Sequence, residues 1–435
     1  MIDETVLFTT SIDLSNHPMI NAKIKLKKQY YLVLKYFVKK QLDNKYTNSR
    51  LIQYKEKFFN RIEIMEEESQ IKNIIKALIN SRFKPWKKKY KYWIMCDVAL
   101  ILMNDELIDK TALEMKKYMS QRQQKQFDIL LNALKDNNVD ISSIIFAEEL
   151  MTQYRENRRF KEIKMHKYIV TANMSAGKST LINALVGKPL LKMSQEVCTS
   201  NLCYLYNKPY EDERVHLQNI DFTNNATEKD LRNISWKTKT SIASYFRGID
   251  DIKSHICIID TPGVNYVLNQ KHGKISQEIL QQEEYKKIIY ILNANKLRTD
   301  EEINYLKWIS ENLSKEKVIF VLNKLDEFRI AYDDIFMGIN NVKKDLIIMG
   351  FENPVICPIS AYFALLIKMK ANGYELTDDE IDEYLFYIKK FRKKEYDFSK
   401  YYQGVYLEDG DNEIVEMSKK CGLYGLEKML LGGII

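Results

Sequence analysis

The sequence predicts an all-α helical module over residues 1–160, followed by an α/β domain over residues 161–435 with a mainly parallel sheet flanked by helices. Residues 23–160 contain no glycine and one proline, and their apolar residues recur at spacings of three and four. From Met165 onward, short β-branched runs alternate with longer amphipathic segments. A chain of 435 residues is long enough for two or three separate cores.

The helical pattern of the first part is clearest in two stretches. "IKNIIKALI" at residues 71–79 and "QFDILLNALK" at residues 126–135 each place apolar side chains on one helical face. Turn signals around Pro85 and in "KDNNVD", residues 135–140, separate the helices. We therefore expect several helices, packed as a bundle.

The second part contains five apolar runs that predict buried strands. They are "KYIVTA" at 167–172, "HICIID" at 255–260, "KIIYILNA" at 287–294, "KVIFVLN" at 317–323 and "NPVICPI" at 353–359. "DEEINYLKWISENL", residues 300–313, predicts a helix between two of them. Ligands of such sheets bind at the carboxyl ends of the strands, so candidate site residues are sought there.

Composition limits the classes of protein. No run of 18 apolar residues indicates a membrane span, and the N-terminus lacks the pattern of a secretory signal, which favours the cytoplasm. The six cysteines form no CxxC pair, which favours free thiols over a metal site. Residues 1–160 carry a net charge of +9 and the remainder −1, giving the +8 of the chain. The basic excess therefore belongs to the helical module.

The stretch "TANMSAGKST", Thr171 to Thr180, nearly matches the phosphate-binding pattern GxxxxGK[ST], with Ala172 in place of the first glycine. Such a loop between a strand and a helix directs backbone N–H groups at phosphates. Lys178 is expected at the β- and γ-phosphates and the Ser179 hydroxyl at Mg²⁺. The candidate nucleotide-binding residues of this loop are Asn173, Met174, Ser175, Ala176, Gly177, Lys178, Ser179 and Thr180.

Ala172 is compatible with this interpretation if its φ is negative, whereas Gly177 is expected where a side chain would block a close approach.

"DTPG" follows the next strand: Asp260 is expected to support Mg²⁺ through a water, and the Gly263 amide to sense the γ-phosphate. Val264 stands where Ras-like enzymes have a glutamine that orients water. Another group must therefore place the attacking water.

"NKLD" follows the strand at 317–323 and predicts the base. The Asp326 carboxylate accepts two hydrogen bonds, which matches the N1–H and N2 donors of guanine and mismatches adenine. Asn323 and Lys324 belong to the same motif, and Ser360 and Ala361 of "PISA" are expected to complete the guanine pocket.

Between the first two motifs, Thr199 is the candidate threonine for binding Mg²⁺ and for placing the attacking water. Thr180, Thr223 and Thr227 are alternatives.

Together, "NMSAGKSTLINALVG", Thr199, "DTPG", "IIYILNANKLRTDEEINYLKWI" and "VIFVLNKLD" resemble the GTPase domain of the dynamin superfamily, bacterial dynamin-like proteins in particular, over residues 160–435. The resemblance implies a GTPase that uses GTP and Mg²⁺ and is stimulated when two GTPase domains meet, in a homodimer or with a second dynamin-like chain. It implies that Ser175 binds a monovalent cation and stabilises the transition state, and that Thr199 places the water. Its catalytic set is Ser175, Lys178, Thr199 and Gly263, and its metal set is Ser179, Thr199 and Asp260.

The sequence departs from large dynamins after the GTPase motifs. Only residues 362–435 follow "PISA", and "GLYGLEKMLLGGII" resembles the closing helix of the GTPase domain. A full stalk and membrane-binding element does not fit in that length. The helical module or a partner chain is expected to supply a neck or part of a stalk, and helical assembly for membrane fission is not predicted.

"RFKPWKKKYKYW", Arg82 to Trp93, places six basic residues among aromatic ones. A solvated helix face is the ordinary interpretation of this segment. Binding to an anionic membrane surface, at the inner face of the membrane, ranks second, and binding to nucleic acid third.

Taken with the GTPase motifs, the sequence predicts a dynamin-like mechanoenzyme. A regulatory GTP-binding switch associated with ribosomes or RNA is the alternative, and a scaffold with a decayed site is disfavoured by the intact Lys178, Ser179, Asp260 and Asp326.

Overall fold

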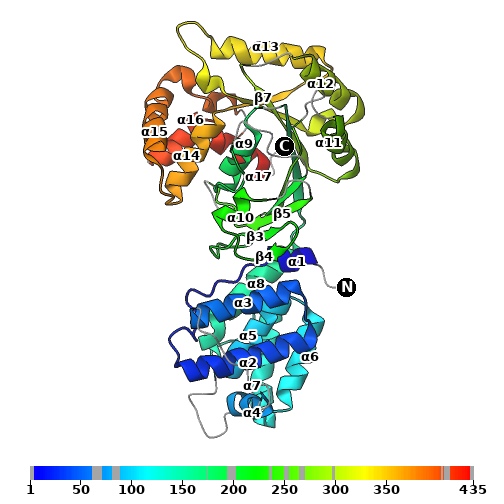
Figure 1. The fold of residues 1–435 in the computed structure, drawn as a ribbon, viewed down its shortest axis with the longest axis vertical. Coiled ribbons are helices and arrows are strands. Elements are labelled where there is room, and N and C mark those ends of the chain that lie inside the picture. Colours follow the sequence, from blue (N-terminus) through cyan, green and yellow to red (C-terminus); the bar gives the residue numbers. More distant parts are fainter. Residues whose placement is uncertain are drawn as a thin grey trace. The chain divides into compact units, whose positions relative to one another are not determined.

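The computed structural model describes residues 4–60, 71–80, 89–173, 175–193, 202–234, 238–248, 254–263, 270–295, 299–402, 405 and 412–431. The chain forms two compact units. The first contains Met1–Lys164, Lys208–His216 and Asp221–Asn225, and the second contains Met165–Asn207, Leu217–Ile220 and Ala226–Ile435 (Figure 1). The two short segments of the first unit come from a part of the chain that lies between strands of the sheet.

Within Met1–Lys164, the described residues form helices, turns and loops and no strand, in agreement with the predicted helical module. Its helix α5, Tyr90–Leu102, is the central one: 11 of its 13 residues are buried, and it packs against the other helices of the unit. A helix that is apolar on every side is stable only when surrounded in this way. The remaining helices are α1 Glu4–Thr9, α2 Ile24–Gln41, α3 Lys45–Phe59, α4 Ile71–Ile79, α6 Asp105–Lys116, α7 Gln121–Lys135 and α8 Glu148–Glu162. Among the residues that the structure describes, no helix has both the length and the apolar character needed to cross a bilayer.

A carboxylate lies at the centre of this helical core and is fully satisfied. Asp97 of α5 accepts hydrogen bonds from the hydroxyls of Tyr30 and Tyr54, at 2.5 and 3.0 Å, and lies 3.1 Å from Nε2 of His17. The backbone N–H of Met19 donates to His17 Nδ1, so Nε2 carries the proton and donates to Asp97. Burial, with Asp97 adding to it, raises the pKa of both tyrosines well above the usual value. The cluster is a structural network rather than an open site.

Only residues 89–93 of the basic segment 82–93 are described, and they are partly buried. Residues 82–88, with Trp86, lie outside the described residues. Lys91 is buried, and the Trp93 indole donates a hydrogen bond to the Phe146 carbonyl at 3.0 Å. Lys89 is exposed, with its ammonium 5.0 Å from the centre of the Phe146 ring. Lys91 and Trp93 therefore serve the packing of the helical unit, because α5 begins within this segment.

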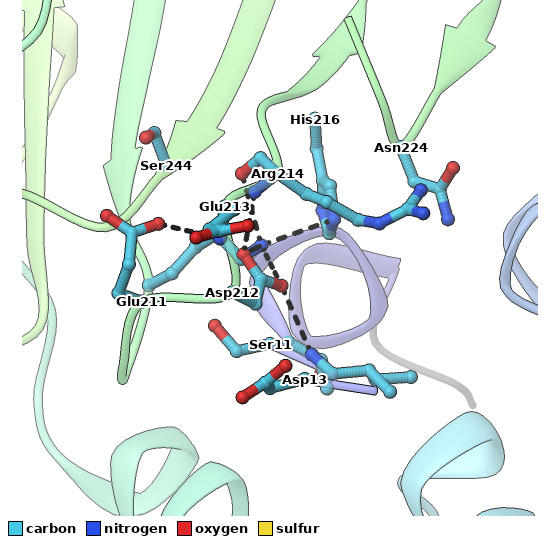
Figure 2. Close-up of polar contacts among 12 residues, drawn as sticks. Ser11, Asp13, Glu211, Asp212, Glu213, Arg214, His216, Asn224 and Ser244 are labelled. Carbon is cyan, nitrogen blue, oxygen red and sulfur yellow. Dashed lines mark hydrogen bonds and ion pairs between the residues drawn. The ribbon is translucent and has the colours of Figure 1, made fainter. Parts of the chain in front are cut away.

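Hydrogen bonds to residues near the N-terminus join the segment Lys208–His216 to the helical unit; Figure 2 shows Asp212 and His216 of this segment. Asp212 accepts the backbone N–H of Ile12 at 3.1 Å, and His216 Nδ1 donates to the Phe8 carbonyl at 2.6 Å. A buried ion pair within the segment orients these groups: the Lys208 ammonium lies 2.5 Å from Asp212 Oδ2, and both side chains are almost fully buried. Lys208 also donates to His216 Nε2 at 3.3 Å.

We predict that Asp212→Asn destabilises the helical unit by about 3–5 kcal/mol, because it leaves the Lys208 ammonium buried without a counter-charge. The measurement is the midpoint of denaturant unfolding of the full chain. Glu213→Gln is the matched control, because Glu213 is the neighbouring exposed carboxylate and its substitution should shift the midpoint little. Equal midpoints for the two variants would show that the pair is energetically unimportant.

The second unit is built on most of a nine-stranded sheet with the order β4-β3-β5-β2-β6-β1-β7-β8-β9; β4 and the first residue of β3 belong to the segments of the first unit. Five neighbours, β6-β1-β7-β8-β9, are parallel, and β2 pairs antiparallel with β6. This confirms the mainly parallel sheet, and the five predicted strands are these five. The bounds are β1 His166–Ala172, β2 Cys203–Asn207, β3 His216–Gln218, β4 Phe222–Thr223, β5 Thr240–Ser244, β6 Ile256–Asp260, β7 Lys287–Asn293, β8 Val318–Asn323 and β9 Val355–Ile359.

Helices cover both faces of the sheet. Tyr290 of β7 lies 6.1 Å, ring to ring, from Tyr305 of α12, whereas its neighbour Ile289 lines a small cavity with Leu185 of α9 and Leu430 of α17. Alternate residues of one strand therefore contact different helical layers. The helices are α9 Lys178–Val186, α10 Glu228–Arg232, α11 Gln270–Gln282, α12 Asp300–Asn312, α13 Ile335–Ile348, α14 Ala361–Ala371, α15 Asp378–Phe391, α16 Glu413–Lys420 and α17 Leu423–Leu431. Short 3₁₀ turns are η3 Ile145–Ala147, η4 Lys315–Lys317, η5 Leu325–Glu327, η6 Lys394–Tyr396 and η7 Ser399–Tyr401.

Candidate functional site

The loop between β1 and α9 has the backbone shape that the phosphate-binding pattern predicts. Ala172 ends β1 in extended conformation and is fully buried, so a glycine is not needed there. Ser175 and Gly177 adopt left-handed conformations, with φ of 62° and 89°. Gly177 is the N-cap of α9, so the free N–H groups of the first helical turn begin at this loop. A helix N-terminus after such a loop suits an anion.

Two asparagines at the ends of neighbouring strands support this loop. Asn293 ends β7 and Asn323 ends β8, and the two are paired in the sheet register. The Asn293 amide donates to the Ser175 carbonyl at 3.3 Å, and the Asn323 amide donates to the Ala176 carbonyl at 2.8 Å. The carbonyls of two consecutive loop residues thus accept hydrogen bonds from side chains of two adjacent strands. The N–H groups of these loop residues can therefore be directed at a ligand.

Gly177 is required by contact as well as by φ. A Cβ atom at this position would lie 2.3 Å from Nδ2 of Asn323, far inside contact distance. We therefore predict that Gly177→Ala lowers nucleotide affinity about tenfold or more, since the strain of about 1–3 kcal/mol must be relieved by moving Asn323 or the loop.

Gly373→Ala is the matched control for this substitution. Gly373 has a φ of +73°, and a Cβ there would meet nothing within 4 Å. It carries the same backbone strain without the contact, so its nucleotide affinity should stay within about twofold of the wild type. Calorimetric titration of both variants with GDP measures the difference. Equal affinities would mean that the Asn323 contact does not matter.

Lys178 and Asp260 form a buried pair at the carboxyl ends of the central strands. Lys178 begins α9, Asp260 ends β6, and the Lys178 ammonium donates to Asp260 Oδ1. Burial raises the pKa of Asp260, and the Lys178 charge opposes this shift. The other oxygen, Oδ2, is buried and makes no hydrogen bond to the described residues.

This donor set fits a magnesium ion. Mg²⁺ prefers oxygen ligands, uses one or two carboxylates at most, and keeps several waters. A buried carboxylate oxygen without a partner beside the half-buried Ser179 at the start of α9 provides that chemistry. Among the described residues, no cluster of three or more His, Cys, Asp or Glu side chains forms a denser metal site. The residues present are therefore suited to a hydrated ion shared with a phosphate.

Asp326 lies three residues after the end of β8, in a nearly dry position. It belongs to the turn η5, is 6% exposed, and burial raises its pKa. The Ala361 N–H donates to Asn323 Oδ1 at 3.0 Å, so Asn323 joins the "PISA" backbone to the phosphate loop. Ser360 is fully buried, and its Oγ makes no hydrogen bond of normal geometry to the described residues.

The predicted site residues gather at one edge of the sheet wherever the structure describes them. Asn173 is half-buried and donates to Thr299 Oγ1 at 3.3 Å, and Lys324 adopts a φ of 71° and pairs with Glu327 at 3.1 Å. Thr180 and Gly263 are half-buried beside the same loop and strand end. Met174 and Thr199 lie outside the described residues, so their roles stay predictions.

Two of the threonines named as alternatives to Thr199 have local structural roles. Thr227 caps α10, with Oγ1 accepting the Asp230 N–H at 3.3 Å. Thr223 lies in β4 and accepts the Asn225 N–H at 3.2 Å. Both hydroxyls are explained by local backbone bonding.

Three residues of the site were not predicted. Asn293 was overlooked although "IYILN" and "IFVLN" end their strands in the same way, and that repeat is a usable signal. Lys390 of α15 donates to the Asp326 backbone carbonyl, Tyr387 lies one turn earlier on the same helix, and no local pattern marks them.

Comparison with known proteins is consistent with this geometry. Residues 169–325 match the sequence profile of the Dynamin family. This part of the chain is therefore similar to the Dynamin family. The matched residues run from β1 through the phosphate loop and Asp260 to the start of η5. The predicted resemblance to dynamin-like proteins is confirmed.

Two curated relatives show the range of the family. The probable transmembrane GTPase FZO-like, chloroplastic, of Arabidopsis thaliana is 27% identical over 48% of this chain and 21% of its own. Dynamin-like protein 1 of Campylobacter jejuni is 25% identical over 52% of this chain and 36% of its own. A solved oligomerised bacterial dynamin pair, described as sensing and tethering membranes, is 18% identical over 93% of this chain and 60% of that one, with a TM-score of 0.38. The chain thus matches only about a fifth of the length of the first relative and about a third of the second.

Proposed function

We propose that this chain binds GTP and hydrolyses it to GDP and phosphate, and that it works as a dynamin-like mechanoenzyme on a membrane or a partner protein. The observation that carries the proposal is Asn323, whose amide bonds both to the phosphate loop and to the loop after β9. One side chain thus fixes the distance between the phosphate site and the carboxylate that would recognise guanine.

In the proposed reaction a water oxygen attacks the γ-phosphorus while the bond to the β-phosphate oxygen breaks, so phosphate leaves and GDP remains. The Lys178 ammonium neutralises charge on the transferring group, and the Gly263 amide holds a γ-phosphate oxygen. Thr199 is assigned the placement of the water, because Val264 replaces the glutamine of Ras-like enzymes. Ser175 is exposed and would act with a monovalent cation.

Mg²⁺ would be held by Ser179, Thr199 and, through a water, by Asp260, and would supply charge neutralisation at the β- and γ-phosphate oxygens. The Lys178 ammonium contacts Asp260, so the cation and the carboxylate proposed for the phosphates and for Mg²⁺ lie side by side.

We predict that Ser175→Ala lowers GTP turnover by about 10²-fold, because a transition-state contact is lost. The loop itself depends on the Ser175 carbonyl, which Asn293 binds, and the side chain is exposed. Affinity for GDP should therefore change by less than about threefold. Single-turnover kinetics and calorimetry separate the two quantities. A parallel loss of affinity and turnover would contradict the catalytic assignment.

The experiment that tests the proposal is GTP turnover by the full chain against protein concentration, with and without anionic liposomes. Turnover per molecule that rises with concentration supports activation by paired GTPase domains. A further rise with liposomes supports action at membranes, a setting suggested by the name of the Arabidopsis relative. Flat turnover with stimulation by RNA or ribosomes would instead support a regulatory switch.

A further inference from the structure

The outward face of helix α15 is apolar at its centre. The helix packs against α14 through the buried rings of Tyr384 and Phe391 (Figure 1). Away from this contact, Ile381, Leu385 and Phe386 are 43, 57 and 59% exposed. Residues three and four apart lie on one side of a helix, so the exposed side chains form a stripe opposite the buried ones. Large apolar side chains gathered on one exposed face indicate a contact surface.

Charged side chains flank this apolar centre in a regular order. Asp378 and Asp382 precede it or lie at its beginning, Lys389 and Lys393 follow it, and all four are exposed. None of the four forms an ion pair with another residue that the structure describes. The helix dipole favours acidic residues at the start of a helix and basic ones at its end, so it accounts for the order of the charges. It does not account for the exposed apolar side chains between them.

The stripe is complementary to a second copy of itself. In a two-fold pair of antiparallel helices, residues at equal distances on either side of the axis face each other. An axis through the apolar centre that is midway between Asp382 and Lys389 is also midway between Asp378 and Lys393. Both aspartates of one copy then face lysines of the other, and the apolar side chains of the two copies meet in the middle.

We propose that two copies of this chain pair through α15, as antiparallel helices about a two-fold axis. A second copy fits this face because it offers both signs of charge in the required order. An anionic membrane would instead meet the exposed carboxylates of Asp378 and Asp382, which oppose such binding. Helix α15 lies beyond residues 169–325, so the match to the Dynamin family assigns it no role.

The same helix reaches the proposed guanine site. The Lys390 ammonium donates a hydrogen bond to the Asp326 backbone carbonyl and lies 5.6 Å from the centre of the Phe386 ring. Because Phe386 belongs to the exposed stripe, a second copy docked there lies against the group that supports the turn of Asp326. An effect of pairing on GTP turnover rests on the proposed function, whereas the pairing itself does not.

The test is sedimentation velocity of the full chain without nucleotide, over a range of protein concentrations. The wild type should form a dimer. Asp382→Lys and Lys389→Asp should each raise the dissociation constant about tenfold or more, because each places like charges opposite one another twice. An equimolar mixture of these two variants should associate as the wild type does, since every inner contact then joins opposite charges. Lys343→Asp, at an exposed lysine of α13, is the control and should leave association unchanged.

A wild type that stays monomeric at about 100 μM overturns the proposal, because a specific interface of two helices should hold at that concentration. A mixture that associates no better than either variant alone overturns the two-fold arrangement. Equal weakening by Lys343→Asp would show that the copies meet elsewhere. GTP turnover is measured on the same samples: a wild type that dimerises but does not hydrolyse GTP would refute the proposed function and leave the α15 interface standing.

Discussion

Lys178→Ala is expected to reduce GTP turnover by about 10³-fold, because it removes the charge that faces the transferring phosphate. A second effect adds to the first. Lys178 is the group that opposes the burial-driven rise in the pKa of Asp260. Without it the pKa rises further, the carboxyl group takes up a proton more readily, and the site for a hydrated cation is weakened.

Steady-state turnover and calorimetric GDP binding at several Mg²⁺ concentrations measure both effects. The variant should bind GDP more weakly and should depend less on Mg²⁺. Lys368→Ala is the matched control: Lys368 of α14 and Glu427 of α17 form a buried pair in the same unit, 1% and 3% exposed. Lys368→Ala should be less stable than the wild type, because Glu427 loses its ion-pair partner. The variant should nevertheless retain GTP turnover at temperatures below its unfolding transition. Wild-type turnover in Lys178→Ala would refute the phosphate site.

The strands of the central sheet were predictable because they are nearly continuous apolar runs. A parallel strand is buried on both faces, so "KIIYIL" and "KVIFVL" stand out at once. Strands β2 to β5 were not predicted, since "CYLYN" and "TSIAS" are short and mix polar with apolar residues. Nothing local in Lys208–His216 indicated that it belongs with the helices. Its place depends on hydrogen bonds from Asp212 and His216 to backbone groups of Ile12 and Phe8, which no local pattern indicates.

The site was predictable to the extent that its chemistry lies in short motifs. Lys178, Asp260, Asn323 and Asp326 each follow or end a predicted strand, so topology alone brings them to one edge of the sheet. Their mutual contacts were not predictable: the role of Asn323 as the link between two loops requires the register of β7 to β9. Lys390 meets the Asp326 backbone only because α15 folds back, about 60 residues later in the chain.

Asp326→Asn is expected to change which base is bound. The amide presents one donor where guanine also presents donors, so one hydrogen bond is lost and a repulsive contact is created in a nearly dry pocket. GDP affinity should fall by about 10³- to 10⁴-fold. XDP carries a carbonyl at C2 in place of the amine, and the side-chain amide donor of the variant suits that acceptor. XDP should therefore bind the variant better than GDP does.

Calorimetry or competition with a fluorescent nucleotide measures both affinities. Glu327→Gln is the control, because Glu327 is the adjacent carboxylate but is exposed and pairs with Lys324. Removing its charge should change GDP affinity by at most about threefold and should leave XDP unfavoured. If Asp326→Asn bound GDP as the wild type does, the base would have to be recognised elsewhere. A loss of both nucleotides with no gain for XDP would instead point to a collapsed turn, since Asn323, Ala361 and Lys390 all depend on its backbone position.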